Sequence, residues 1–285
     1  MVDNQEDGET LQNDINKLIQ WSNDWLLTFN SAKCKHVHLG PPTGTKYKMG
    51  NEEIQQSSEE KDLGITIDNK LKFQQHINTQ TKKANQRLGM IKRSFKYMDK
   101  DMFLPLYKSI VRPHLEYGSN VWSVIYQKEA IQIENVQRRA TKLVKNIQHL
   151  SYSERLKTLG IPSLQYRRLR ADMVETLRII NNIDKVDSNK IFPTKPTTTR
   201  GHKHKIYKKY SRTNIRKSCF TQRIVDTWNK LPQKVVDCKT VNAFKHNLND
   251  HWKSLSIKFT PDIYKDPDVG IENQNRWVRG AIGPD

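Results

Sequence analysis

The chain has 285 residues, of which 35% are hydrophobic, and this content excludes an intrinsically disordered protein. It carries 49 Lys and Arg side chains against 30 Asp and Glu, and the net charge of +19 predicts an anionic polymer or surface as its partner. Its apolar runs are short and no signal pattern opens the chain, so we expect a soluble intracellular protein, nuclear or cytoplasmic, with no membrane partner. Three widely spaced cysteines encode neither a disulfide framework nor a four-ligand zinc site.

The charge is unevenly distributed along the chain. Residues 1–60 contain five basic and ten acidic side chains, whereas the remaining residues contain 44 basic and 20 acidic ones. The basic part of the chain therefore begins after residue 60.

The first predicted element is an amphipathic helix. Apolar residues recur at three-to-four residue spacing from Leu11 to Phe29, which is typical of a helix with one buried stripe. Tryptophans lie on this stripe and on later apolar stripes, and we expect the following four in the core: Trp21, Trp25, Trp122 and Trp228.

Short strands are predicted next. "KHVHLG" reads as a strand, and "YKMGNEEIQ" reads as a hairpin that turns at Gly50 and Asn51, because these residues tolerate positive φ. "DLGITID" predicts a further strand, which ends at a turn on Asn69. We therefore expect a small antiparallel sheet packed on the first helix.

After Phe73 the periodicity becomes helical for more than a hundred residues. Two long apolar stripes, over 73–95 and 131–147, predict two helices, and Pro105 and Pro113 restrict the segment between them to short helical pieces or kinks. Ser151 and Glu154 have capping-box spacing before a short helix, and a longer helix runs from Ser163 to about residue 182. A compact helical bundle is expected.

The last part of the chain changes composition. Residues 184–200 combine two prolines and four threonines and predict a linker, residues 201–254 predict a small basic region, and residues 255–285 predict a mobile tail. The predicted fold class is therefore α+β, mainly α, with boundaries near residues 70, 183, 200 and 254.

Basic residues repeat at helical spacing on the two long helices. They lie away from the apolar stripes or flank them: Lys82, Lys83, Arg87, Lys92, Arg93 and Lys96 on the first helix, and Arg138, Arg139, Lys142 and Lys145 on the second. Such charges are commonly only the solvated side of a helix. The charge excess after residue 60 favours a role in following phosphates, with salt-sensitive binding.

A second basic cluster, "RGHKHKIYKKYSRTNIRK", interleaves two tyrosines, Tyr207 and Tyr210, with cations. The residues predicted to bind nucleic acid here are Arg200, His202, Lys203, Lys205 and Tyr207. Basic side chains with interspersed rings are typical of surfaces that bind single strands. A loosely ordered basic linker would have the same composition.

Three candidate metal sites are weak on spacing alone. Strand alternation would place the side chains of Cys34, His36 and His38 on one face, but no fourth ligand follows at zinc-site spacing, and a half-buried strand explains the pattern equally well. Acidic residues alternate in two places, Asp99 with Asp101 and Asp266 with Asp268; helix capping accounts for the first pair, and the second lies in the predicted tail. No two aspartates are adjacent anywhere in the sequence.

Six ordered segments carry a resemblance to a known family. They are "LQNDINKLIQWSNDWLLTFNSAKCKHVHLG", "EKDLGITIDNKLKFQQHI", "LYKSIVRPHLEYGSNVW", "NVQRRATKLV", "YSERLKTLGIPSLQYRRLRADMVE" and "FTQRIVDTWNKLP". In this order they resemble the C-terminal part of reverse transcriptases, RNA-directed DNA polymerases, from non-LTR retrotransposons (LINEs) of the jockey and chicken-repeat kind. The resemblance implies the end of a palm, then a thumb, then a C-terminal region that binds nucleic acid.

The resemblance also implies roles for particular residues. Lys33 matches the lysine implied to act on the pyrophosphate side in an intact polymerase, and Leu63 and Gly64 match the hairpin that grips the primer end. The family's catalytic aspartate pair, which would hold Mg²⁺, has no counterpart here, so we expect no cofactor in this chain although the complete family enzyme requires Mg²⁺.

The resulting hypothesis is a part of a reverse transcriptase that binds RNA, DNA or an RNA–DNA hybrid through its thumb and does not polymerise alone. A non-enzymatic nucleic-acid-binding protein derived from a retroelement is the first alternative. The second alternative is a subunit that complements fingers and palm residues supplied in trans.

Overall fold

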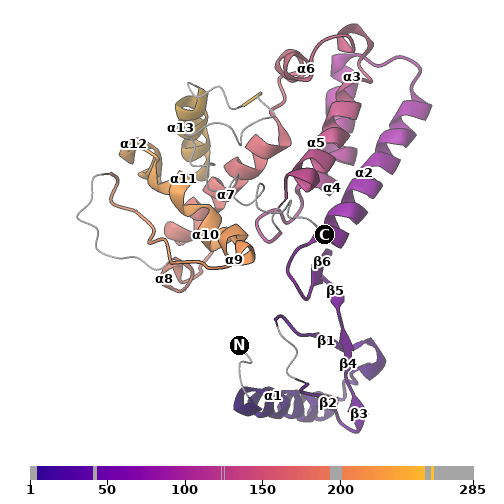
Figure 1. Cartoon of the computed structure of the whole chain (residues 1–285), viewed down its shortest axis with the longest axis vertical. Helices are drawn as coiled ribbons and strands as arrows, with labels where there is room; N and C mark the ends of the chain where they lie inside the picture. The colour runs from indigo at the N-terminus through magenta and orange to yellow at the C-terminus, as the bar shows by residue number, and fades with distance from the viewer. Residues whose placement is uncertain are drawn as a thin grey trace, which may run out of the picture. The chain divides into compact units, whose positions relative to one another are not determined.

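The computed structural model of this chain describes residues 5–40, 44–122, 124, 126–192, 201–253 and 258–259 (Figure 1). Internal contacts divide the chain into two compact units, Met1–His76 and Ile77–Asp285. Each unit has its own architecture, the first mixed and the second helical. The predicted subdivision of the second unit stays a prediction.

The first unit contains one long helix and six short strands. These are α1 (Gln5–Asp24), the 3₁₀ turn η1 (Ser31–Lys33), β1 (Lys35–Val37), β2 (Lys48–Met49), β3 (Glu52–Glu53), β4 (Gln55–Ser57), β5 (Glu59–Asp62) and β6 (Ile65–Asp68). The predicted hairpin is present as β2–β3, where Met49 pairs with Glu52 and Gly50 takes a φ of 65°.

The expected single antiparallel sheet was wrong. The strands form three separate pairs, and β1 pairs with β4 in parallel, with Lys35 opposite Gln55. The β2–β3 hairpin lies between these two strands in the chain. The strand predicted over "DLGITID" begins later than expected: Ile65–Asp68 form β6, whereas Asp62 ends β5, and Leu63 and Gly64 form the turn of the antiparallel β5–β6 hairpin, with φ values of 45° and 87°.

The expectation that Trp21 and Trp25 lie in the core was also wrong. Trp21 is 49% exposed and Trp25 is 67% exposed, whereas Trp122 and Trp228 are buried as predicted. Other residues of the apolar stripe of α1 are also exposed, among them Leu18 at 53%. A polar contact attaches α1 to β2 instead, because the side-chain amide of Gln12 both donates to and accepts from the Lys48 backbone, at 2.8 Å in each case.

One carboxylate fixes the chain where it enters α2 (Gln74–Ser94). Asp68 accepts hydrogen bonds from the backbone N–H groups of Lys70, Lys72 and Phe73, the last at 2.6 Å. Phe73 takes a φ of 56°, a conformation that needs such support.

The second unit begins with helices that follow the predicted breaks. They are α2, α3 (Lys100–Leu106), the π-helical η2 (Tyr107–Val111), α4 (Pro113–Glu116), α5 (Gln127–Thr141), η3 (Lys145–Ile147), α6 (Tyr152–Leu159) and α7 (Leu164–Ile180). The capping box of Ser151 and Glu154 is formed at the start of α6, and Gly160 ends that helix with a φ of 69°. Both long apolar stripes are therefore helical, although α5 ends at Thr141 and the second stripe continues into η3.

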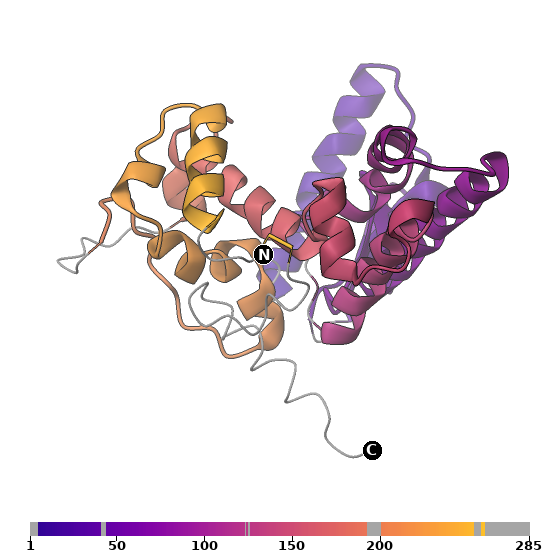
Figure 2. The same ribbon diagram turned by 90° about the horizontal axis from the view of Figure 1, so that it is seen from above.

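Short helices follow α7 and share its core. They are α8 (Ser188–Ile191), α9 (Asn214–Ser218), α10 (Phe220–Arg223), α11 (Val225–Asn229), α12 (Gln233–Val236) and α13 (Val241–Lys253). Met173 and Leu177 of α7 belong to one buried cluster with Trp228 and Phe244, and α13 lies beside α7 (Figure 2). Residues 193–200 of the predicted linker, and all of the predicted tail except 258–259, lie outside the described residues. Within the described ranges, none of the helices is long and apolar enough to span a bilayer.

A buried ion pair joins distant parts of the second unit. The Arg223 guanidinium donates to both carboxylate oxygens of Asp172 at 2.8 Å, and the two side chains are 6% and 9% exposed. Arg223 also donates to the backbone carbonyls of Ser119, Asn120 and Ser218. A single side chain thus holds α7, the segment after α4 and the α9–α10 junction together.

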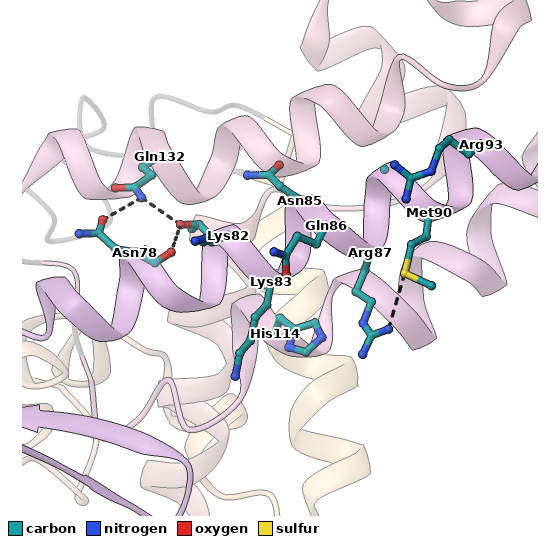
Figure 3. A pocket seen from close by; sticks show the side chains of 12 residues that line it. Asn78, Lys82, Lys83, Asn85, Gln86, Arg87, Met90, Arg93, His114 and Gln132 are labelled. Atoms are coloured by element: carbon teal, nitrogen blue, oxygen red, sulfur yellow. Dashed lines mark hydrogen bonds between the residues drawn. The ribbon is translucent and has the colours of Figure 1, made fainter.

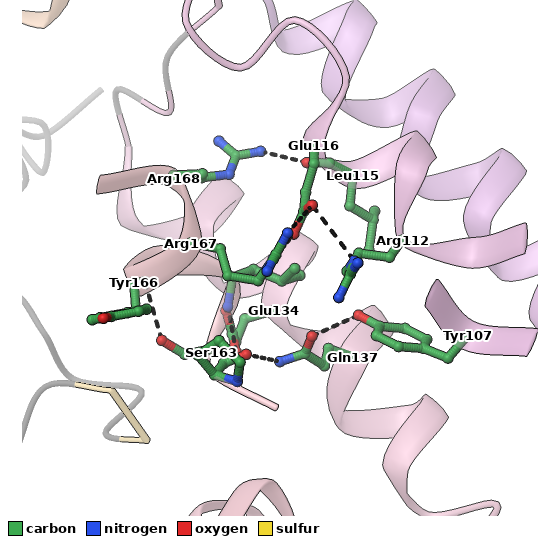
Figure 4. A network of polar contacts seen from close by, with 12 residues as sticks. Tyr107, Arg112, Leu115, Glu116, Glu134, Gln137, Ser163, Tyr166, Arg167 and Arg168 are labelled. Atoms are coloured by element: carbon green, nitrogen blue, oxygen red, sulfur yellow. Dashed lines mark hydrogen bonds and ion pairs between the residues drawn. The ribbon is translucent and has the colours of Figure 1, made fainter. Parts of the chain in front are cut away.

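A buried polar network joins α5 to the start of α7 (Figure 4). Glu134 accepts hydrogen bonds from the Tyr152 hydroxyl and from the Leu164 backbone N–H. Gln137 accepts from the Tyr107 hydroxyl at 2.6 Å and donates to the Tyr152 hydroxyl at 3.0 Å. Burial raises the pKa of Glu134 above its usual value, although these hydrogen bonds oppose the shift.

Replacing Glu134 by Gln is expected to change how stability depends on pH. The folded-state pKa of Glu134 is raised. Its contribution to the free energy of unfolding is therefore present below the pKa of the unfolded state and is lost as pH rises through the pKa of the folded state. Glu134→Gln should therefore gain free energy of unfolding relative to wild type as pH rises from about 4 to about 8. Urea denaturation followed by circular dichroism at several pH values measures this difference.

Glu154→Gln is the matched control, because hydrogen bonds to Ser151 lower the pKa of Glu154 and give the opposite sign. Its free energy of unfolding should fall relative to wild type as pH rises. A difference between Glu134→Gln and wild type that is flat or falls with pH would contradict the assignment.

Candidate nucleic-acid interface

An open groove of about 1070 Å³ runs along α2 (Figure 3). Its lining combines residues from α2, α4 and α5: Asn78, Thr81, Lys82, Lys83, Asn85, Gln86, Arg87, Gly89, Met90, Arg93, His114 and Gln132. The opposite face of α2 is buried through Ile77, Ala84, Leu88 and Ile91. Burial of that face fixes which side chains of the helix line the groove.

The groove is cationic. Four of its twelve described lining residues, Lys82, Lys83, Arg87 and Arg93, are Lys or Arg, and none of the twelve is Asp or Glu. All four are exposed, and within the described part of the chain none of them forms a salt bridge. An unneutralised row of this kind attracts anions and suits a phosphate backbone.

Side-chain amides line the groove beside these cations. Gln132 of α5 donates to the Asn78 side-chain oxygen at 3.0 Å and to the Thr81 hydroxyl at 2.9 Å. Arg139 of α5 donates to the Asn85 side-chain oxygen at 2.9 Å. These bonds hold α2 and α5 side by side and bring Arg139 next to the groove.

His114 of α4 lies close to Lys83 and Arg87 in the groove (Figure 3). Burial lowers the pKa of His114, and the positive charges of Arg87 and Lys83 lower it further. The imidazole is therefore neutral at pH 7. A bound phosphate would favour the protonated form, because it adds a negative charge next to the ring.

The other predicted cations of the two long helices have different surroundings. Lys92 and Lys142 are exposed. Arg138 lies over the Tyr152 ring at 5.0 Å, and Lys145 lies over the Tyr97 ring at 5.7 Å. The structure thus brings Lys82, Lys83, Arg87 and Arg93 together in one groove, whereas Lys92, Arg138, Lys142 and Lys145, together with Lys96 and Arg139, lie outside its lining.

In the second basic cluster, more side chains are buried or paired than the composition indicates. His202 is 3% exposed, and its Nε2 lies 2.9 Å from the Trp228 carbonyl oxygen, so its side chain is not available to bind nucleic acid at the surface. Lys203 pairs with Asp237 at 3.3 Å. Lys205 is half-buried and Tyr207 is 37% exposed. Arg200 lies outside the described residues, and no strand forms in the described part of this cluster.

In the first unit, Lys33 is exposed in η1, and its backbone N–H donates to the Asn30 side-chain oxygen. Leu63 is 84% exposed at the β5–β6 turn beside Gly64. The residues matched to the pyrophosphate role and to the primer grip are therefore both accessible.

The described residues do not fit a divalent metal site. They contain no group of three or more His, Cys, Asp or Glu side chains that could hold a metal ion. The carboxylate of Asp99 accepts from the Met102 N–H and caps α3, and Cys34 contacts the Asn30 carbonyl through its Sγ. Asp266 and Asp268 lie outside the described residues. We therefore derive no metal-dependent step.

Sequence periodicity missed the groove residues contributed by α4 and α5. His114 follows a proline in a short helical piece, and Gln132 lies on a helix whose cations stood out instead. Only tertiary packing places His114 of α4 beside Lys83 and Gln132 of α5 beside Asn78.

Comparison with known proteins gives distant relatives. The RNA-directed DNA polymerase from mobile element jockey of Drosophila melanogaster is 27% identical over 141 residues, which cover 47% of this chain and 15% of that protein. The probable RNA-directed DNA polymerase from transposon BS of the same organism is 26% identical over 142 residues, covering 47% and 16%. An uncharacterized protein of Caenorhabditis elegans is 28% identical over 125 residues, covering 43% and 61%.

No protein-family model and no solved structure matches the chain. The chain spans less than two thirds of the length of each of these three relatives. Two of the three are RNA-directed DNA polymerases of mobile elements. Over slightly less than half of its length, this chain is therefore a homologue of the reverse transcriptases of non-LTR retrotransposons.

Proposed function

We propose that this chain is a reverse-transcriptase-derived protein that binds template–primer nucleic acid along the groove on α2. The observation that carries this function is the lining of the groove, with four Lys and Arg side chains and no carboxylate among its twelve described residues. Binding of a phosphate backbone there would release counterions and weaken as salt rises. The homology to RNA-directed DNA polymerases supports nucleic acid as the polyanion.

We further propose an assignment of the chain to polymerase parts. Residues 1–70 correspond to the end of a palm, and the exposed turn at Leu63 and Gly64 acts as the primer-grip hairpin. Residues 71–183 correspond to a thumb, residues 184–200 to a linker and residues 201–254 to a basic C-terminal region, followed by a tail. The groove on α2 then belongs to the thumb.

In the same proposal the chain does not polymerise by itself. Two-metal phosphoryl transfer needs carboxylate oxygens around both ions, and this sequence has no adjacent aspartates. Within the described part of the chain no cluster of ligands accompanies Lys33. Two kinds of protein would have a cationic groove but no catalytic carboxylates. One is a binding protein derived from a retroelement, and the other is a subunit that complements fingers and palm residues supplied in trans.

The double variant Lys83→Ala with Arg87→Ala tests the groove. Removing two phosphate contacts should weaken binding to a 20-base-pair RNA–DNA hybrid regardless of its sequence. It should also reduce the slope of log affinity against log salt by about 2, roughly 1 for each cation. Fluorescence anisotropy with a labelled hybrid between about 50 and 200 mM salt measures both quantities.

The control is Lys157→Ala with Lys234→Ala, which removes the same charge from exposed lysines outside the groove. It should change the salt slope much less than the groove variant does. Equal slopes for the two double variants would show that net charge, and not the groove, determines binding.

The affinity for the same hybrid should rise as pH falls from about 7.5 to about 5.5, because a bound phosphate restores the lowered pKa of His114 and binding takes up a proton. His114→Gln should remove part of this rise, whereas His246→Gln, at an exposed position on α13, should not. The measurement is anisotropy at constant ionic strength. If His114→Gln follows the wild-type pH dependence, phosphate does not approach this imidazole.

A primer-extension assay tests the catalytic part. The purified chain with Mg²⁺ or Mn²⁺, template–primer and deoxynucleotides should give no extension, because the carboxylates that seat both ions are absent from the sequence. Extension by the chain alone would overturn this part. Extension only after addition of separately produced fingers and palm residues would identify the complementing subunit.

A further inference from the structure

Tyr210 is the most exposed aromatic side chain among the large hydrophobics of the described residues, at 91%. The chain on its N-terminal side is fixed, because Ile206 is buried and exchanges two backbone-to-side-chain hydrogen bonds of 2.9 Å with Asn229. On its C-terminal side Thr213 caps α9 by accepting from the Arg216 N–H. The ring is thus presented to solvent from a short loop that is anchored at both ends.

The segment that carries this ring is rich in cations and contains no acidic residue. Residues 201–217 contain seven Lys and Arg and no Asp or Glu. Lys208 pairs with Asp226, whereas Lys209, Arg212 and Arg216 are exposed and form no salt bridge within the described residues. An exposed ring among unpaired cations provides both a surface for stacking a base and charges for its phosphates.

We propose that the loop at Lys209–Arg216 is a second nucleic-acid site, which takes an unpaired nucleotide by stacking its base on Tyr210. It differs from the groove on α2, which has cations but no ring among its lining residues except His114. The inference rests on the proposed function only in assigning nucleic acid as the ligand. It adds a preference for single strands at a separate surface.

The structure selects Tyr210 over Tyr207, although the sequence pattern treats the two tyrosines alike. Tyr207 is only 37% exposed and has a partner within the chain. The neighbours of Tyr210 in the chain, Lys209 and Ser211, are polar, so no apolar side chain adjoins the ring in sequence to insert with it into a lipid surface. A stacked base is therefore the better match than a membrane.

Tyr210→Ala and Tyr210→Phe test the stacking. Tyr210→Ala should bind a 12-nucleotide uridine oligomer at least about fivefold more weakly, because stacking of one base contributes roughly 1–3 kcal/mol. Tyr210→Phe retains the ring and should bind within about twofold of wild type. A blunt RNA–DNA hybrid should bind all three proteins alike, because it has no unpaired base. The measurements are anisotropy titrations at fixed salt.

A second pair of measurements separates the contribution of the Tyr210 ring to binding from that of the neighbouring cations. Arg212→Ala with Arg216→Ala should lower the salt slope on the single strand by about 1.4, roughly 0.7 for each cation, whereas Tyr210→Ala should leave that slope unchanged. Circular dichroism of each variant confirms folding.

Three outcomes would overturn the inference. They are wild-type affinity of Tyr210→Ala for the single strand, an equal loss on the blunt hybrid, and an equal loss on vesicles of anionic phospholipid. A failure of the proposed function would be seen separately. It would appear as unchanged binding of the RNA–DNA hybrid by the Lys83→Ala, Arg87→Ala double variant, a measurement that does not involve Tyr210.

Discussion

Burial of one face of α2 is the constraint on which the candidate interface depends. Because Ile77, Ala84, Leu88 and Ile91 pack inward, Lys82, Lys83, Arg87 and Arg93 lie on the rest of the helix and are exposed. Hydrogen bonds to α5 then fix the helix against its neighbour and bring side-chain amides beside the charges. A helix with the same composition but another apolar register would scatter these cations over its surface. The positive charge of the groove is thus a consequence of core packing together with the absence of carboxylates from its described lining.

The sequence predicted the helices of the second unit well, because their signals are local. The capping box of Ser151, the glycine at 160 and the prolines at 105 and 113 each act within one helical turn. The first unit was predicted less well, since pairing of its very short strands depends on contacts distant in the sequence. The parallel β1–β4 pair has no local signature, and the stripe of α1 looks like a core stripe in the sequence although Trp25 is two-thirds exposed.

The candidate site divides in the same way. Lys82, Lys83, Arg87 and Arg93 were identified from charge and helical spacing, and the structure brings them into one groove. His114 and Gln132 join them only through tertiary contact. In the second basic cluster, composition could not distinguish the buried His202, which contacts the Trp228 carbonyl oxygen, from the exposed Tyr210. Composition thus located both basic regions, and burial decided which side chains in them are available.

The sequence separation between Arg223 and its partner has a consequence for folding during translation. Its partner Asp172 is made 51 residues earlier, and at roughly 10 residues per second about 5 s of translation separate the two. During that interval the arginine that binds this carboxylate in the folded protein has not been made, nor has Trp228, which shares a buried cluster with Met173 and Leu177 of α7. The core around α7 can therefore close only after the last helices of the unit have been synthesised.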